Sequence, residues 1–176
     1  MSTKYSDGEL NIRRAKKDDM TAVAEMIQEL ADFEKMPNGP KLSVTDLKRD
    51  GFESQPPAFQ CLVAEVSGRD SNVIVGYALY FPTYSTWEGK SMMLEDLYVR
   101  TSERRRGVGD KLFNAVANEA KASGSSRLDF HVLEWNDARS FYEGKGAVNL
   151  TKTEQWCYYR LTGESLQRAA LQGKIK

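Results

Sequence analysis

The segment from residue 94 to residue 120 constrains the fold most, because it predicts a strand, a turn and a helix in close succession. The stretch LEDLYV (94–99) ends in aromatic and β-branched residues, which is typical of a strand. The stretch RRRGVG (104–109) then carries two glycines. The apolar residues that follow recur at helical spacing and predict an amphipathic helix from Val108; they are Leu112, Phe113, Val116, Ala117 and Ala120. The glycines therefore occupy a strand-to-helix turn.

This turn has the properties of an anion-binding site. The first N–H groups of a helix have no intrahelical acceptor, and the helix dipole places partial positive charge at the same end. Helix N-termini therefore bind phosphate groups. Gly107 and Gly109 would let the backbone approach an anion that a Cβ atom would keep away. Attraction for a polyphosphate would come from Arg104, Arg105 and Arg106.

The residues around the glycines fit neither of two widespread phosphate loops. A Walker A loop requires lysine and then serine or threonine after its second glycine, whereas Asp110 follows Gly109. A dinucleotide-binding fingerprint requires a third glycine, and Phe113 stands near that position.

Arg104 to Gly109 instead resembles the acetyl-coenzyme A (acetyl-CoA) pyrophosphate loop of the GCN5-related N-acetyltransferases (GNAT). Other blocks resemble one branch of that family, the diamine (spermidine/spermine) acetyltransferases and their thialysine acetyltransferase relatives. In chain order these blocks are LADFEKM (30–36), CLVAEV (61–66), YSTWEG (84–89), LED (94–96), EWN (134–136) and FY (141–142). The resemblance implies acetyl transfer from acetyl-CoA to an amine.

The order of the remaining elements predicts an α/β fold. The predicted strands are residues 10–14, 59–66, 73–80, 92–99, 127–133 and 156–161. The predicted helices are residues 19–33, 43–49, 108–120, 136–145 and 163–171, with Asp18 or Asp19 capping the first, Ser43 capping the second and Gly51 stopping it. With the resemblance, this implies a GNAT fold, whose mixed, mostly antiparallel central sheet of six to seven strands has helices on both faces. At 176 residues we expect a single domain, 1–176, with a flexible N-terminus at 1–9.

Composition gives no argument for a nucleic-acid or membrane partner. The chain has 25 basic and 25 acidic residues. Its polar N-terminus lacks the apolar core of a signal peptide, and no run approaches the roughly 20 apolar residues of a membrane span. Cys61 and Cys157 lie in apolar runs and are expected to be buried free thiols. With one histidine and separated cysteines we expect no metal site, and the expected location is cytoplasmic.

Acetyl transfer to an amine needs a base, because an alkylamine with a pKa of about 10 is protonated at neutral pH. It also needs a donor for the leaving thiolate. The resemblance implies Glu95, the first carboxylate of the LED motif, as the base acting through water, and Tyr142 as the proton donor. The alternatives are a solvent-facing acid or arginine partner for Glu95, and a packing aromatic for Tyr142. Strand alternation predicts that Glu95 and Asp96 point to opposite faces.

For acetyl-CoA, the resemblance implies a pantetheine arm that meets strand backbone where the sheet splays, and a pyrophosphate on the glycine turn. Arg105 occupies a position at which many relatives have glycine. The implied contacts are Leu97, Tyr98, Val99, Arg104, Arg105, Arg106, Gly107, Val108, Gly109, Asp110, Asn136, Asp137, Ala138 and Arg139.

For the amine, carboxylates and aromatic rings suit a cationic, aliphatic substrate. The implied substrate-binding residues are Phe33, Glu34, Trp87, Glu95, Asp96, Asp129, Phe130, His131 and Glu154. Glu34 and Trp87 could equally be solvent-facing and interface residues, and His131 a packed or hydrogen-bonded one.

The YSTWEG segment (84–89) distinguishes the two kinds of acetyltransferase in this branch. Diamine acetyltransferases have an acidic residue where this chain has Ser85 and Thr86, and they have a hydrophobic residue in place of His131. We therefore expect a small primary amine of the thialysine, lysine-analogue or short diamine type. The alternatives are a spermidine/spermine acetyltransferase proper, a protein-amine acetyltransferase and a non-catalytic acyl-CoA binding module. Family analogy also implies a homodimer, with Trp87 or the terminal strand near its interface.

Overall fold

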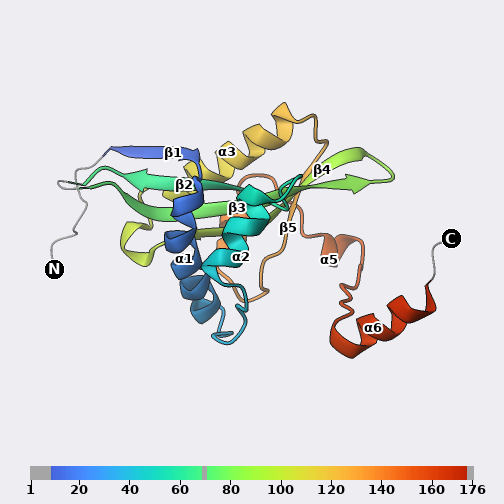
Figure 1. Ribbon diagram of the computed structural model, residues 1–176. Helices are drawn as coiled ribbons and strands as arrows, with labels where there is room; N and C mark the ends of the chain where they lie inside the picture. The colour runs from blue at the N-terminus through green and yellow to red at the C-terminus, as the bar shows by residue number, and fades with distance from the viewer. Residues whose placement is uncertain (1–8, 69–70, 174–176) are drawn as a thin grey trace. The chain divides into compact units, whose positions relative to one another are not determined.

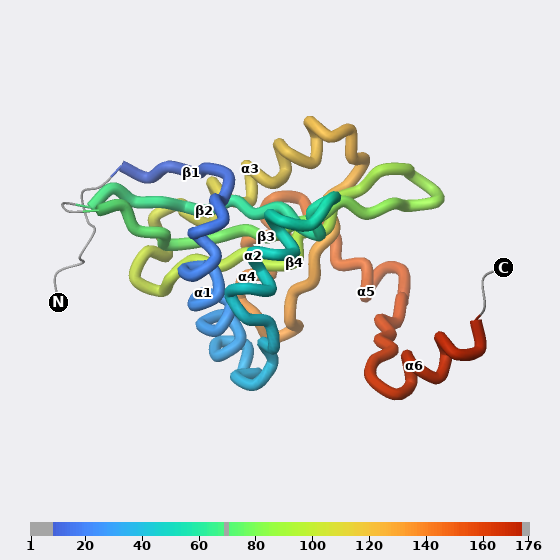
Figure 2. Tube along the Cα trace, in the orientation of Figure 1, coloured from blue at the N-terminus to red at the C-terminus, as the bar shows by residue number. Residues whose placement is uncertain are grey.

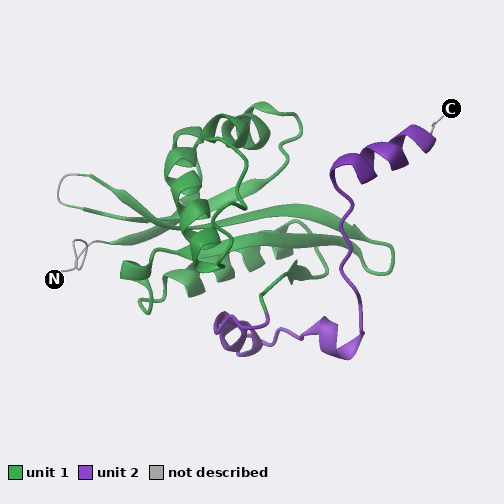
Figure 3. Ribbon diagram, turned by 90° about the horizontal axis from the view of Figure 1, so that it is seen from below, with its two compact units in different colours: residues 1–133 green, residues 134–176 purple. Residues whose placement is uncertain are grey.

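The computed structural model of the chain describes residues 9–68 and 71–173 (Figure 1). The chain divides into two compact units, residues 1–133 and residues 134–176 (Figure 3). Of the N-terminal segment 1–9 that we expected to be flexible, residues 1–8 lie outside the described residues. The single domain expected from the length stays a prediction.

The first unit contains a sheet of five strands in the order β1-β2-β3-β4-β5. The first four strands pair in antiparallel fashion, and the last runs parallel to its neighbour, so the sheet is mixed as predicted. The strands are β1 (Leu10–Arg14), β2 (Gln60–Val66), β3 (Val73–Ser85), β4 (Gly89–Val99) and β5 (Leu128–Phe130).

The helices of this unit follow the predicted segments closely. They are α1 (Met20–Phe33), α2 (Val44–Lys48) and α3 (Val108–Ala122), with short turns η1 (Lys17–Asp19), η2 (Arg49–Glu53) and η3 (Thr101–Glu103). The Ser43 cap is confirmed, because its hydroxyl accepts from Asp46 N at 3.2 Å. Asp19 instead accepts from Lys16 N at 2.6 Å, ahead of η1. The helical path continues through Gly51, where we had predicted a stop.

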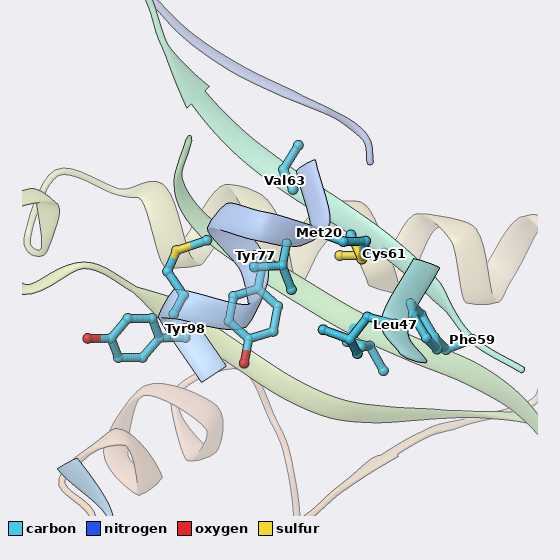
Figure 4. Close-up of a cluster of buried hydrophobic side chains, with 10 residues drawn as sticks. Met20, Leu47, Phe59, Cys61, Val63, Tyr77 and Tyr98 are labelled. Atoms are coloured by element: carbon cyan, nitrogen blue, oxygen red, sulfur yellow. The ribbon is translucent and has the colours of Figure 1, made fainter. Parts of the chain in front are cut away.

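Helices cover both faces of the sheet, as predicted (Figures 1 and 2). On one face, α1 and α2 pack on β2, β3 and β4 through a cluster that includes Met20, Leu47 and Tyr77 (Figure 4). On the other face, α3 lies against Gly76 of β3, where a Cβ atom would stand 3.2 Å from Leu112 Cδ1. The core therefore has two layers separated by the sheet.

A β-bulge interrupts β4 in the middle of the LED motif. Tyr80 pairs with Leu94 while the preceding Leu79 pairs with Asp96, so Glu95 is an extra residue in β4. The bulge changes which residues face which layer. Leu94 pairs with Phe130, whose ring contacts the α3 layer, whereas Asp96 pairs with Leu79 of the α1 cluster.

The described part of the second unit contains three short helices. They are α4 (Ala138–Glu143), α5 (Leu150–Thr153) and α6 (Gly163–Gln172). The predicted helices at 136–145 and 163–171 are confirmed with adjusted ends, and α5 was not predicted. The strand predicted at 156–161 is wrong, because this segment has no regular structure and Trp156, Tyr158 and Tyr159 are exposed. Cys157 in the same segment is also exposed, so the buried thiol expected there is wrong, whereas Cys61 is buried as expected.

The described sheet therefore has five strands rather than the six to seven we expected. Aromatic residues favour strands only where a neighbouring strand satisfies the backbone and packs on the side chains. Within the described ranges, no strand pairs with 156–161. No described helix is long and apolar enough to cross a membrane.

Candidate active site

The edge of β4 that pairs with β5 is paired over only part of its length. Pairing with β5 covers only Met92 to Leu94, whereas β4 continues to Val99. Over residues 95–99, β3 is the one strand paired with β4 in the described part of the chain. The backbone of Leu97 and Tyr98, which we expected to meet a pantetheine arm, thus lies beyond the end of the β4–β5 ladder. Val99 O accepts from Arg104 Nε at 2.9 Å.

Three carboxylates gather near the end of the β4–β5 ladder. Glu95 is exposed at the bulge, Asp96 is partly buried beneath α1, and Glu34 follows the last turn of α1. Burial is the main cause that raises the pKa of Asp96 to about 6, and the charges of Glu95 and Glu34 raise it further. A hydrogen bond from the Tyr77 hydroxyl to Asp96 Oδ2, at 2.9 Å, opposes this rise. Burial also raises the pKa of Glu34.

Four other proposed amine-binding residues of this unit lie at the β3–β4 turn, in β5 or directly after it. Trp87 is 84% exposed at the turn between β3 and β4. Asp129 lies in β5 and accepts from Arg127 Nε at 2.9 Å. The Phe130 ring packs edge-on against Phe113, with centroids 5.8 Å apart. His131 directly follows β5.

The glycine turn has the geometry of an open helix start. Gly107 is the N-cap of α3 with φ 76°, and it has no side chain to accept from the first N–H groups of the helix. Arg105 also adopts a positive φ of 63°, a conformation that glycine adopts readily and other residues rarely. Its position is the one at which many relatives have glycine.

The three arginines of the turn differ in their surroundings. The guanidinium of Arg104 lies over two rings, 5.3 Å from the centroids of both Phe33 and Tyr98. Arg106 pairs with the buried Glu103 at 2.5 Å. The Arg105 side chain makes no hydrogen bond or ion pair with the described residues. Arg105 is therefore the arginine whose charge is available to a ligand.

In the second unit, the expected co-substrate residues form the start of α4. Asn136 Oδ1 accepts from Ala138 N at 2.9 Å, which fixes the first turn after Asp137. Arg139 donates to Glu134 O at 2.9 Å. These contacts orient the loop that precedes α4.

Tyr142 lies on α4 beside Phe141, with ring centroids 5.0 Å apart. It is partly buried, and burial raises its pKa to about 12. The phenol therefore keeps its proton at neutral pH. Further along, Glu154 Oε2 accepts from Trp156 Nε1 at 2.6 Å.

Sequence reasoning missed Tyr77, which donates to Asp96. Its position in a β-rich run predicts packing, and packing alone does not require a hydroxyl. The available signal was a tyrosine at a fully buried strand position, since a buried hydroxyl needs a partner. No described group of three or more histidine, cysteine or acidic side chains is arranged to hold a metal ion.

The chain is similar to known proteins over most of its length. The acetyltransferase (GNAT) family model matches residues 24–146. The thialysine N-epsilon-acetyltransferase of Bos taurus is 39% identical over 164 residues, which cover 90% of this chain and 96% of the relative. The spermidine/spermine N(1)-acetyltransferase-like protein 1 of Homo sapiens is 35% identical over 159 residues, which cover 88% of this chain and 23% of that protein.

Among solved structures, an integron cassette protein from the mobile metagenome of V. cholerae has a similar fold. The TM-score is 0.69 at 24% identity, over 92% of this chain and 97% of the other. With the family match over most of the chain, this chain belongs to the acetyltransferase (GNAT) family, in its diamine and thialysine acetyltransferase branch, and is an N-acetyltransferase.

Proposed function

We propose that the chain transfers the acetyl group of acetyl-CoA to the primary amine of a small substrate of the thialysine, lysine-analogue or short diamine type. The transfer takes place by direct attack in a ternary complex. The observation that carries the proposal is the position of Glu95, which is exposed at the bulge just beyond the end of the β4–β5 ladder. A carboxylate there adjoins the strand backbone proposed to hold the pantetheine arm.

Glu95 acts as the base in this proposal. The incoming amine is protonated at neutral pH and must lose a proton before its lone pair can attack. Glu95 takes that proton through a water molecule. The amine nitrogen then bonds to the thioester carbon, and the carbon–sulfur bond breaks.

The residues of the glycine turn fit the diphosphate of acetyl-CoA. Gly107, as the N-cap, has no side chain that could accept from the first N–H groups of α3, and Arg105 adds a cation without a protein partner among the described residues. When bound, acetyl-CoA supplies the activated acetyl group. Asn136, Asp137, Ala138 and Arg139 are proposed as further contacts of the co-substrate.

Tyr142 donates a proton to the leaving thiolate in this proposal. Its phenol is protonated at neutral pH, because burial raises its pKa to about 12. Once the proton has passed to sulfur, the tyrosinate is a strong base that regains a proton readily.

The carboxylates near the end of the β4–β5 ladder support a cationic substrate. Glu34, Glu95 and Asp96 lie close enough for their charges to act on one another, which favours binding of an ammonium group. Ser85 and Thr86 leave the β3–β4 hairpin without the acid that the diamine enzymes have there. This difference favours a short amine over a long polycation.

A substrate panel tests the proposal. Purified protein is given acetyl-CoA with thialysine, lysine, short diamines, spermidine, spermine or a lysine peptide, and release of free thiol is followed. We expect the highest kcat/KM with thialysine or a short diamine. Preference for spermine or for the peptide would reassign the acceptor. Cofactor binding in a calorimeter with no turnover on any amine would make the chain a binding module instead.

We also propose that two copies form a homodimer. Tyr84 and Trp87 are 75% and 84% exposed near the turn of the β3–β4 hairpin, and exposed aromatic groups of this kind mark interaction surfaces. Sedimentation of the wild type and of Trp87→Ser tests this. We expect a dimer that the substitution weakens, and a wild-type monomer at micromolar concentration would rule the dimer out.

A further inference from the structure

Tyr77 combines complete burial with a polar contact. It lies on β3 beneath α1 with no exposed surface, in the apolar cluster of Figure 4. Its ring packs 6.5 Å from that of Tyr98, centroid to centroid. Its hydroxyl donates to Asp96 Oδ2 at 2.9 Å. A phenylalanine would fill the same space, so the packing does not explain the hydroxyl.

Among the described residues, Tyr77 is the group that favours the ionised form of Asp96. The titratable groups that face it are Tyr77 on β3, Glu34 after α1, Cys61 on β2 and Glu95 on its own strand. Burial and the charges of Glu34 and Glu95 disfavour the carboxylate. The hydrogen bond from Tyr77 is the contact that stabilises it. It also occupies Oδ2, which leaves Oδ1 for a ligand.

We propose that Tyr77 is a positioning residue that holds Asp96 as an oriented, ionised acceptor for the amine substrate. It thereby sets the lowest pH at which the enzyme binds its amine. The inference rests on the proposed function, because it assigns Asp96 to the amine. Tyr77 itself does not touch the substrate and acts through Asp96 alone.

The inference predicts a specific change in the pH profile. The pKa of Tyr77 is raised well above 10, mainly by burial, so its hydroxyl remains a donor throughout an assay range from pH 5 to pH 9. Tyr77→Phe removes a hydrogen bond to a charged acceptor, which should raise the pKa of Asp96 by about one unit. The acidic limb of kcat/KM for the amine then moves up by about one pH unit.

The same change should separate binding from turnover. Near pH 6.5, Tyr77→Phe should raise KM for the amine by about threefold, because a pKa about one unit higher leaves less of Asp96 ionised. At saturating amine, kcat should change by less than about twofold. Near pH 9, the KM values of variant and wild type should converge.

The chain offers a matched control on the same strand. Tyr80 is equally buried, and its hydroxyl has no hydrogen-bond partner in the described structure. It pairs with Leu94, on the α3 side of the sheet. Tyr80→Phe removes the same atom from the same strand without touching Asp96. Its pH profile should match that of the wild type.

Two further measurements exclude a purely structural role. In an Asp96→Asn background, Tyr77→Phe should no longer move the acidic limb, because the titrating group is gone. In protein labelled with ¹³C at aspartate carboxyl carbons, the signal lost in Asp96→Asn should titrate near pH 6 in the wild type and about one unit higher in Tyr77→Phe.

The outcomes separate this inference from the proposed function. An active wild type whose acidic limb does not move in Tyr77→Phe overturns the inference and leaves the acetyltransferase proposal intact. A shift that persists in the Asp96→Asn background also overturns it. A wild type that acetylates no amine overturns both. The inference is supported if the acidic limb moves in Tyr77→Phe but not in Tyr80→Phe or in the Asp96→Asn background, and if the carboxyl titration moves with it.

Discussion

The guanidinium carbon of Arg104 lies 5.3 Å from the centroid of the Phe33 ring. Arg104 belongs to the turn proposed to bind acetyl-CoA, and Phe33 ends the helix proposed to border the amine. The same guanidinium lies 5.3 Å from the Tyr98 ring, and its Nε donates to Val99 O. One side chain therefore joins the turn, α1 and β4.

Replacing Arg104 with lysine should loosen this junction. Lysine keeps the charge but loses the planar contact with the two rings and the hydrogen bond from Nε. We expect Arg104→Lys to lower the free energy of unfolding by about 1–2 kcal/mol. Urea denaturation measures the change. Arg105→Lys is the matched control, since Arg105 has no such contacts, and an equal loss in both variants would contradict the junction.

Arg105 should be a site of backbone strain. A non-glycine residue at φ 63° pays a steric penalty that glycine avoids, although glycine loses more entropy on folding. We expect Arg105→Gly to raise the free energy of unfolding by about 0.5 kcal/mol. The same variant should raise KM for acetyl-CoA, because a cation at the proposed phosphate site is lost. Arg105→Lys should keep KM near that of the wild type; if it rises as much as in Arg105→Gly, the charge is not the cause.

Asp96 should make the fold less stable at neutral pH. Its folded-state pKa is raised from 3.8 to about 6, so between these values the unfolded state releases the proton first. Stability therefore falls as pH rises from about 4 to about 6. Asparagine removes this titration and still offers Tyr77 an oxygen acceptor. We expect Asp96→Asn to gain about 2 kcal/mol near pH 8 and little near pH 3.

Urea denaturation at a series of pH values measures the gain. Asp18→Asn is the control, because the Asp18 side chain is 97% exposed. A gain in Asp96→Asn that does not depend on pH would point to a cause other than ionisation.

Glu95→Gln should remove the proposed base. We expect kcat/KM at neutral pH to fall by about 100-fold or more. The deficit should shrink as the pH approaches the pKa of the amine, because the substrate then arrives without its extra proton. Initial rates from pH 7 to pH 10 measure this. Glu53→Gln, which alters an exposed ion pair with Lys17, should leave the profile unchanged.

Tyr142→Phe should slow the release of coenzyme A. We expect kcat to fall by about 100-fold with little change in thermal stability. In the wild type, kcat should show no loss from ionisation of Tyr142 below about pH 11, because its pKa is about 12. Tyr159→Phe is the control, since Tyr159 is 87% exposed in the same unit. A Tyr142→Phe variant with normal kcat would return Tyr142 to a packing role.

Sequence patterns predicted most elements of the first unit because their signals are local. The apolar spacing from Val108 predicted α3, and the Ser43 cap predicted the start of α2. The strand at 156–161 failed because strand formation depends on a partner that lies elsewhere in the chain. The same dependence explains why β5 spans only Leu128–Phe130 where seven residues were expected.

The arrangement of the site was less predictable than its residues. Strict alternation along β4 would put Leu94 and Asp96 on the same face, whereas the bulge puts them on opposite faces. The contacts of Arg104 with Phe33 and of Tyr77 with Asp96 join residues far apart in the sequence, so no local pattern indicates them. The catalytic and binding roles of the proposed residues stay predictions.

The extra residue in β4 has a consequence for protein engineering. A designer who regularised this sheet by deleting Glu95 would restore uninterrupted alternation from Gly89 to Val99. Leu94 and Asp96 would keep their partners Tyr80 and Leu79, and therefore their layers. The residue lost would be the proposed base. An idealised backbone of this fold would thus gain regular strand pairing and lose the carboxylate proposed to deprotonate the amine. Redesign of the scaffold must therefore keep the bulge in β4.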